Sequence, residues 1–320
     1  MKTEYKQDVE LICKLNQKWE PATIRVKRLG GQTNRNYLVK HQSNKFFVRL
    51  PWERADVINR AKEGKNIVAL ARNKNLARIL PRYYAYILQK KNILAPKSRD
   101  VFDVPDGTMV AEFLEGREFT FQMFQQKKYQ EALAKTLHIL HTSGIRFGNP
   151  YDVFRDEVKK YRFAAMEYPI GKFLGRETVR ELLEIEKEAE QKLCVFKGGI
   201  STHNDFLFQN VLVAKSKRLH LLDFEYAGLN KRGGIFYDLG YVFRDSFFNP
   251  PRMSPKTFEQ FLSVADKIYG KRLDRNQIYW AVVSALLVGI WWGALRYVSV
   301  PRNERAYFHA YVQRGVQGVL

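Results

Sequence analysis

Two carboxylates and an amide follow one another closely in the second half of the chain, with apolar residues between them. Asp205 and Asn210 lie five positions apart in "STHNDFLFQN" (201–210), and Asp223 follows the apolar run "LHLL". Turns between strands would explain such residues. A metal–phosphate site is the sharper explanation, because an acid at the end of a buried strand is costly unless it has a partner such as a metal ion.

These residue types, in this order, meet the requirements of phosphoryl transfer. A carboxylate accepts the proton of the attacking hydroxyl, while an amide and a second carboxylate bind Mg²⁺. We therefore predict that Asp205 is the base and that Asn210 and Asp223 are the metal ligands. His203, which precedes them, is more typical of a buried histidine bonded to the backbone than of a ligand or base. We predict a structural role for it.

Phosphoryl transfer also requires a phosphate-binding site, and the first part of the chain offers candidates. Gly30 and Gly31 form a turn that would let backbone N–H groups approach phosphates. Arg49, in "FFVRLPW", could hold two phosphates, with Glu63 from the following helix orienting it. Each has an ordinary alternative, namely a hairpin turn, a surface charge and a solvated helix acid. Their occurrence together and in this order favours the phosphate site.

The elements that must position these residues change character near residue 114. Alternating apolar and polar residues predict strands near 23–29, 35–40, 45–50, 83–88 and 108–113. Helical spacing predicts helices at 8–19, 56–75, 129–144, 153–168, 178–196 and 277–295, and a short hairpin covers 210–224. We predict an α+β fold with two lobes. Residues 1–113 form an antiparallel sheet lobe that binds nucleotide, and residues 114–320 form a mainly helical catalytic and substrate-binding lobe.

Composition and charge limit the function classes. The chain has 320 residues, 45% of them hydrophobic, which is enough for a substantial core. Two distant cysteines exclude a disulfide scaffold, and the charged N-terminus shows no signal peptide, so we expect a cytoplasmic protein. The net charge of +21 raises nucleic-acid binding as an alternative. Because the basic residues are scattered and no nucleic-acid motif accompanies them, we expect no specific nucleic-acid partner. Weak association with anionic surfaces stays open.

The segment 277–295 carries no charged residue and is long enough to span a bilayer. A buried core helix has the same composition. We expect the buried helix and no transmembrane segment, since the segment holds Gln277, Ser284 and two glycines.

In several segments the chain resembles the kinase-like phosphotransferases, a group that includes aminoglycoside phosphotransferases and choline kinases. Within this group it is most similar to the bacterial choline kinases. The similar segments are "LGGQTNRNYLV", "FFVRLP", "NRAKEGKNI", "HNDFLFQN", "LLDFEYAG" and "FYDLGYVF". They extend from about residue 24 to about residue 300. The resemblance implies a protein-kinase-like fold. Protein kinases have D-F-G after the metal-binding acid, whereas this chain has "DFEYAG", which disfavours a protein kinase.

The resemblance implies ATP and Mg²⁺ as cofactors and roles for matching residues. Asp205 would be the base, and Asn210 and Asp223 would bind Mg²⁺. The residues expected at the nucleotide are Gly31, Thr33, Asn34, Asn36, Arg49, Glu63, Glu112 and Phe113.

We predict that the phosphoryl acceptor is choline and that the product is phosphocholine. A quaternary ammonium requires aromatic faces and a carboxylate. By resemblance and proximity the expected acceptor-binding residues are Glu225, Tyr226, Asp245, Trp291, Trp292 and Tyr297. Trp291 and Trp292 are adjacent on a helix and point in different directions, so at most one need face the acceptor. Ethanolamine and thiamine are close alternatives, and an aminoglycoside is less expected for so basic a chain. A nucleic-acid-binding protein with a degenerate kinase fold is the alternative of another class.

Overall fold

The computed structural model describes residues 2–30, 34–52 and 59–320. The chain divides into two compact units. Unit 1 comprises Met1–Arg117, Phe147–Asn149 and Leu212–Tyr226, and unit 2 comprises Glu118–Arg146, Pro150–Val211 and Ala227–Leu320. The predicted division at residue 113 assigns Leu212–Tyr226 to the second domain, whereas the structure groups this segment, with Asp223, in unit 1.

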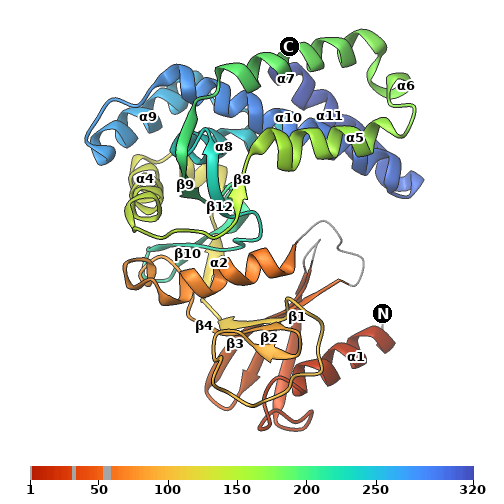
Figure 1. Cartoon of the computed structure of the whole chain (residues 1–320), viewed down its shortest axis with the longest axis vertical. Helices are drawn as coiled ribbons and strands as arrows, with labels where there is room; N and C mark the ends of the chain where they lie inside the picture. The colour runs from red at the N-terminus through yellow and green to blue at the C-terminus, as the bar shows by residue number, and fades with distance from the viewer. Residues whose placement is uncertain (1, 31–33, 53–58) are drawn as a thin grey trace. The chain divides into compact units, whose positions relative to one another are not determined.

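Unit 1 is built on a six-stranded sheet in the order β1-β2-β3-β6-β4-β5, and its neighbouring strands run antiparallel (Figure 1). The strands are β1 (Ile24–Gly30), β2 (Asn34–His41), β3 (Asn44–Pro51), β4 (Tyr83–Leu88), β5 (Lys91–Asn92) and β6 (Met109–Glu112). The five predicted strands are present to within a residue or two of their expected ends. Alternation places Tyr37, Val39, Val48 and Leu50 in the core, all with no exposed surface.

Two helices accompany this sheet. Helix α2 (Arg60–Arg72) lies against β4, and its first turn is capped by Asn59, whose side chain accepts a hydrogen bond from the Lys62 N–H (Figure 1). Helix α1 (Lys2–Cys13) ends earlier than the predicted 8–19. The Asn16 side chain accepts from the Lys18 N–H at 2.9 Å, so a local turn replaces the continuing helix.

A second sheet of unit 1 has the order β11-β10-β7 and contains the predicted hairpin. Its strands are β7 (Gly116–Glu118), β10 (Val211–Ala214) and β11 (Leu219–Leu221). Gly116 is required at this position because a Cβ there would lie 2.5 Å from the Val213 carbonyl oxygen. Asp223 lies two residues after the end of β11, close to the strand end at which the sequence pattern predicts it.

Unit 2 is mainly helical. Its helices are α3 (Phe121–Phe124), α4 (Lys127–Thr142), α5 (Lys159–Met166), α6 (Gly171–Leu174), α7 (Arg176–Lys192), α8 (Ile235–Phe248), α9 (Pro255–Tyr269), α10 (Arg275–Ser299) and α11 (Arg305–Val319). Helix α10 packs on α8 and α11, and α4 packs on α9. Together with the antiparallel sheet of unit 1, this composition confirms the predicted two-lobed α+β kinase-like fold.

A sheet that the sequence did not predict also lies in unit 2. It has the order β8-β12-β9 and consists of β8 (Pro150–Tyr151), β9 (Val195–Thr202) and β12 (Gly228–Arg232). Strand β9 leads directly into the segment that carries Asp205. The expected loop and helices in these regions were therefore wrong for β9 and β12.

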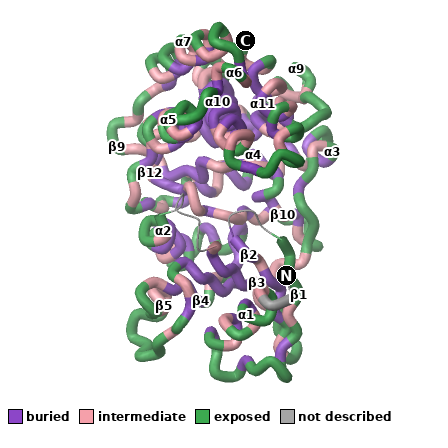
Figure 2. The backbone as a smooth tube through the Cα atoms, turned by 90° about the vertical axis from the view of Figure 1, so that its right-hand side faces the viewer, coloured by how far each residue is buried: buried purple, intermediate pink, exposed green. Residues whose placement is uncertain are grey.

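Helix α10 contains the apolar segment 277–295. By length and hydropathy it qualifies as a candidate membrane span, and 83% of its most apolar stretch is buried within the structure. Figure 2 shows the same helix coloured mostly as buried among its neighbours in unit 2. The burial agrees with the expected core helix.

Candidate active site

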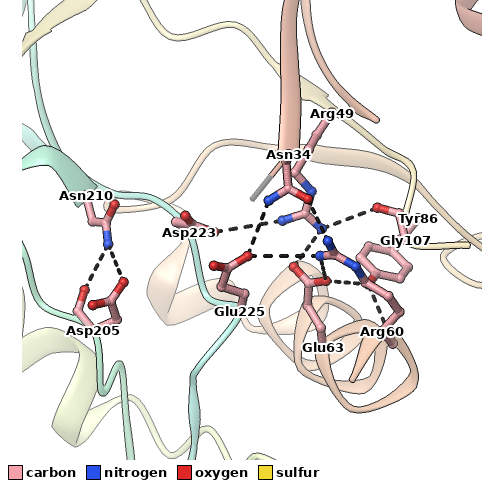
Figure 3. A network of polar contacts seen from close by, with 10 residues as sticks. All are labelled: Asn34, Arg49, Arg60, Glu63, Tyr86, Gly107, Asp205, Asn210, Asp223 and Glu225. Atoms are coloured by element: carbon pink, nitrogen blue, oxygen red, sulfur yellow. Dashed lines mark hydrogen bonds and ion pairs between the residues drawn. The ribbon is translucent and has the colours of Figure 1, made fainter. Parts of the chain in front are cut away.

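An ion pair between β3 and α2 occupies the centre of the polar network in unit 1. The Arg49 guanidinium lies 2.6 Å from the Glu63 carboxylate, and both side chains are almost completely buried (Figure 3). Arg49 also donates to the Gly107 carbonyl at 3.3 Å. The Tyr86 hydroxyl donates to Glu63 at 2.6 Å. The pairing of Arg49 with Glu63 that the sequence led us to expect is thus present in the structure.

The electrostatics of this pair follow from its burial. Burial favours the neutral forms of both groups, but the opposite charge of each partner outweighs it. The pKa of Arg49 is therefore raised and the pKa of Glu63 is lowered from its ordinary value. For Tyr86, burial and the Glu63 charge both raise the pKa of the phenol. Arg49 is a fixed cation, and its Nε atom, which is buried, has no hydrogen-bond partner among the described residues.

A second arginine, Arg60, joins this pair to the segment after β11. It donates to Glu63 at 2.9 Å and to the Asn34 side-chain oxygen at 2.7 Å (Figure 3). Asn34 in turn donates to Glu225 at 3.3 Å. Arg60 was not among the predicted site residues, although it lies in the segment "NRAKEGKNI" three residues before Glu63, a spacing at which helix side chains meet. Gly107 makes room for it, because a Cβ there would lie 2.6 Å from the Arg60 side chain.

The other residues expected at the nucleotide have different surroundings. Gly31 and Thr33 lie outside the described residues. Asn36 lies opposite Arg49 in the β2–β3 ladder. The Glu112 N–H bonds to the Arg82 carbonyl at 2.8 Å, and the Phe113 N–H bonds to the Lys45 carbonyl at 3.4 Å. The structure therefore brings Asn34, Asn36, Arg49 and Glu63 into one region of unit 1 and places Glu112 and Phe113 at the end of β6.

Asp223 adopts a positive φ of 60° after β11, a conformation that is uncommon for a residue other than glycine. Its carboxylate lies 3.9 Å from the Arg49 guanidinium and is 36% exposed. Strained backbone of this kind is often found at functional sites. Tyr226, three residues further on, is half-buried in the same segment of unit 1.

In unit 2, the Asp205 carboxylate is held through both oxygens. The Tyr241 hydroxyl donates to one oxygen at 2.9 Å. The Asn210 amide donates to the other oxygen at 3.1 Å (Figure 3). The same amide donates to the Asp205 carbonyl at 2.9 Å. Because the Asn210 nitrogen is used in this way, its oxygen is the atom that could bind a cation.

Asp238 holds the backbone of the segment that carries Asp205. Its two oxygens accept from the N–H groups of His203 at 2.9 Å and Asn204 at 2.8 Å. His141 lies 2.9 Å from the same carboxylate. Asn204 has a positive φ of 66°, and its side-chain oxygen is bonded to Thr202 and Asn230. Hydrogen bonds of Asp238 and of the Asn204 side chain therefore hold the backbone immediately before Asp205.

His203 itself is completely buried. Its ring packs edge-on against Phe206, with centroids 5.7 Å apart. The segment "FYDLGYVF" contains Asp238 and Tyr241, for which the sequence predicted no role. An acid in the first turn of an apolar helix was the available signal for Asp238, because it must be partnered when it is buried.

The remaining residues expected at the acceptor lie in separate surroundings within unit 2. Trp291 is completely buried. Trp292 packs against Phe308 and Tyr311 of α11, at 5.7 and 5.8 Å between ring centroids. Asp245, on α8, is half-exposed and accepts from Asn249 at 2.7 Å.

Tyr297 stacks on Phe173 at 4.1 Å and also lies near His309. Among the described residues, no ring contact joins Trp291, Trp292 and Tyr297 to one another. The structure does not assemble these three into one aromatic cage.

The oxygen atoms of Asn210 and Asp223 are hard ligands of the type that Mg²⁺ prefers. Within the described ranges no group of three His, Cys, Asp or Glu side chains could hold a metal ion by itself. An amide and a carboxylate that complete their coordination with phosphate oxygens and water are typical of Mg²⁺ bound together with a nucleotide. Each of the two side chains therefore offers an oxygen of the type that such an ion takes.

The kinase-like fold, the buried arginine–glutamate pair and the braced aspartate define a phosphotransferase of the kinase-like class. The family model described as "Choline/ethanolamine kinase" matches residues 26–255, and the chain belongs to this family. No curated protein sequence matches the chain significantly.

Solved structures support the fold assignment. The choline kinase LicA from Streptococcus pneumoniae has a TM-score of 0.72 at 23% identity, with 99% of each chain covered. The ethanolamine kinase of Plasmodium vivax has a TM-score of 0.70 at 17% identity and covers 100% of this chain and 90% of its own. A microcompartment-associated aminopropanol kinase has a TM-score of 0.70 at 14% identity, with coverages of 97% and 95%. LicA is also known in complex with AMP.

Proposed function

We propose that this protein transfers the γ-phosphoryl group of ATP to the hydroxyl of choline, giving phosphocholine and ADP. The observation that carries the proposal is the Asp205 carboxylate, held by Tyr241 and Asn210 in a chain that belongs to the choline/ethanolamine kinase family. Two structurally similar proteins, a choline kinase and an ethanolamine kinase, act on small amino alcohols according to their names.

In this proposal Asp205 orients the acceptor hydroxyl and accepts its proton as the oxygen attacks the γ-phosphorus. The bonds from Tyr241 and Asn210 limit the rotation of the carboxylate, which lowers the entropy cost of reaching the reactive geometry. Asp238 contributes indirectly by holding the backbone at His203 and Asn204.

Arg49 is proposed to bind nucleotide phosphates as a fixed positive charge. Its pairing with Glu63 aligns the guanidinium, and the orphaned Nε atom leaves a donor for a phosphate oxygen. Arg60, in the first turn of α2, would help to hold Glu63, and Asn34 would in turn hold Arg60. Gly31, Thr33 and Asn36 are proposed to cover the phosphates, and Glu112 and Phe113 to lie at the adenine.

Asn210 and Asp223 are proposed to hold Mg²⁺ through their side-chain oxygens. When bound, the ion would neutralise phosphate charge. The chain's own contribution is to supply these oxygens on two short segments, one before β10 and one after β11.

On the acceptor side, we retain Trp292 and Asp245 as proposed contacts because both keep exposed surface. Glu225 and Tyr226 are proposed to border the acceptor from the segment after Asp223. Trp291 has no exposed surface, and Tyr297 is already stacked on Phe173, so we propose that these two support the helix rather than touch the acceptor.

The test is ADP release from ATP and Mg²⁺ with choline, ethanolamine, thiamine or kanamycin as acceptor. We expect stimulation by choline and its loss in Asp205→Asn, while the exposed control Glu188→Gln on α7 keeps the parent rate. Stimulation by ethanolamine or thiamine instead would keep the kinase and replace the acceptor. The absence of stimulation by every compound would contradict the proposal.

A further inference from the structure

Helix α1 of unit 1 carries a buried carboxylate, Asp8, on the side that faces the sheet. Asp8 is 1% exposed, whereas Lys6 and Glu10 of the same helix are exposed. It lies four residues before Ile12, so both side chains share one face of the helix. Ile12 belongs to the hydrophobic core that also contains residues of β2. A buried acid on this face needs polar partners in the sheet.

The Asp8 carboxylate is bound through both of its oxygens to strand β2. One oxygen lies 3.2 Å from the Arg35 guanidinium, and the other accepts a hydrogen bond from the Tyr37 hydroxyl. Burial raises the pKa of Tyr37, and the bond to Asp8 raises it further, so the phenol keeps its proton and donates. Arg35 and Tyr37 are two residues apart and therefore point to the same face of the sheet. A single helix side chain thus holds two successive positions on that face of β2.

Further contacts join α1 to β1 and Arg35 to the end of β3. The Tyr5 hydroxyl of α1 donates to the Val26 carbonyl of β1 at 2.7 Å. The Arg35 guanidinium lies 4.8 Å from the centroid of the Trp52 ring, which follows β3. Arg35 is only 8% exposed, so protein groups rather than solvent determine its position. Helix α1 therefore holds both strands of the β1–β2 hairpin.

The opposite face of β2 belongs to the candidate active site. Asn34 and Asn36 alternate along the strand with the two residues that Asp8 holds, so their side chains point away from α1. The Asn34 side-chain oxygen accepts from Arg60 of α2 at 2.7 Å (Figure 3). Asn36 lies opposite Arg49 in the β2–β3 ladder. Because one strand backbone carries both sets of side chains, a shift on the α1 side would also move the residues on the site side.

We propose that Asp8 is a positioning residue for nucleotide binding. By holding Arg35 and Tyr37, it fixes the backbone of β2 from the side of α1. The strand then presents Asn34 and Asn36 to the nucleotide site in a single arrangement. Asp8 acts only through the strand, since it is buried and both of its oxygens are used. This inference rests on the proposed function and adds to it a residue that lies outside the nucleotide site.

Steady-state kinetics of Asp8→Asn test this role. Asparagine keeps the size of the side chain and can still accept from Tyr37, but it leaves the buried Arg35 cation without its counter-charge. We expect the KM for ATP to rise about tenfold, since small displacements of binding groups are costly. The KM for choline, and kcat at saturating ATP, should change less than about twofold. Glu10→Gln, which changes an exposed acid of the same helix, is the matched control and should keep the parent KM for ATP.

A purely structural role of Asp8 would give a different result. Lost stability lowers the fraction of folded protein and hence the measured kcat, but it leaves the KM values of the folded molecules unchanged. Tyr37→Phe covers the case in which Asp8→Asn folds poorly, because it removes one hydrogen bond and keeps the buried ion pair. We expect its KM for ATP to rise about two- to threefold, the effect of one hydrogen bond.

Hydrogen exchange follows the strand itself, without turnover or nucleotide. In Asp8→Asn and Tyr37→Phe, the amides of residues 34–38 should exchange about tenfold faster than in the parent protein. The amides of β6, which pairs with β3 and β4, should keep their parent rates. Equal acceleration of β2 and β6 would indicate a loss of global stability and would overturn the positioning role.

The outcomes keep this inference and the proposed function apart. A parent-like KM for ATP in both variants, or unchanged exchange at residues 34–38, would overturn the role of Asp8 and leave the kinase intact. If no acceptor stimulates ADP release in the parent protein, the proposed function fails, and the calorimetric Kd for ATP replaces KM. A Kd that Asp8→Asn raises would then support the role of Asp8, and an unchanged Kd would overturn it. A parent protein that binds no ATP would contradict both proposals.

Discussion

At the scale of single residues, Asp205 carries the chemistry of the proposed reaction. Replacing it with asparagine keeps the size of the side chain and an oxygen for the Tyr241 hydroxyl but removes the proton acceptor. We expect kcat to fall by about 10²- to 10⁴-fold, the usual contribution of a positioned base. The Kd for ATP should change less than about threefold, since the lost carboxylate is proposed to contact the acceptor hydroxyl.

The measurement is steady-state kinetics together with calorimetric ATP binding. A variant that turns over near the parent rate would show that Asp205 is not the base. A variant that loses both turnover and ATP binding would point to a structural role instead.

The Arg49–Glu63 pair leads to a prediction on stability. Glu63→Gln leaves the buried Arg49 cation without its closest counter-charge, and the free energy of unfolding should fall by about 3–5 kcal/mol at pH 7. The pKa of Glu63 is lowered on folding, so its contribution is complete above its unfolded pKa and is lost as the pH falls through the folded pKa.

Denaturant unfolding between pH 7 and pH 3 would test this prediction. The difference between parent and Glu63→Gln should shrink as the pH falls. Glu20→Gln, which changes an exposed acid of the same unit, should follow the parent curve. A difference that stays constant across this range would contradict the assignment of the effect to Glu63 ionisation.

At the scale of elements, helices α8, α10 and α11 pack closely because glycine occurs where their side chains meet. A Cβ at Gly289 of α10 would lie 2.4 Å from the Phe248 ring, and one at Gly315 of α11 would lie 2.3 Å from the same ring. Arg244, on α8 beside Phe248, donates to the Tyr311 hydroxyl at 3.1 Å. Close helix contact therefore supports the helix that supplies Tyr241.

We predict that Gly289→Ala destabilises the protein by about 1–3 kcal/mol through overpacking, although alanine is the better helix former. Gly171→Ala is the control, because its nearest atom, in the Arg176 side chain, would lie 3.7 Å from the new Cβ, an ordinary contact. Thermal unfolding of both variants would decide. If Gly289→Ala and the parent unfold at the same midpoint temperature, α10 can shift without loss of stability, and the prediction is wrong.

The elements also show what the sequence could and could not predict. Strands β1, β2 and β3 have clear alternation and short connections, so their residues were predicted closely. Strand β9 contains Gly198 and Gly199 and pairs with β12, which is far away in sequence. Such non-local pairing leaves no local periodicity, and the sheet β8-β12-β9 was missed for this reason.

The same distinction applies to the site. Arg49, Glu63, Asp205, Asn210 and Asp223 occur in recognisable order, so residue type and spacing were enough to predict them as site residues. The roles of Asp238 and Tyr241 depend on the position of α8 beside the segment after β9, and no spacing rule gives that position.

At the scale of the whole molecule, the apolar helix α10 leads to a prediction. Since 83% of its most apolar stretch is buried, little apolar surface is left for lipid. We expect the full chain to remain in the supernatant after ultracentrifugation without detergent, at both low and high salt. Recovery in the membrane pellet that only detergent releases would contradict the assignment of α10 as a core helix. If high salt alone releases the protein from the pellet, the protein binds anionic surfaces through its net charge of +21.

Phosphoryl transfer from ATP to choline is tested most directly with ATP labelled in its γ-phosphoryl group. Transfer of the label to choline is followed in a single turnover with protein in excess. We expect labelled phosphocholine from the parent protein and label that stays in ATP with Asp205→Asn. Label that appears as free phosphate independently of choline, or transfer by Asp205→Asn at the parent rate, would contradict it.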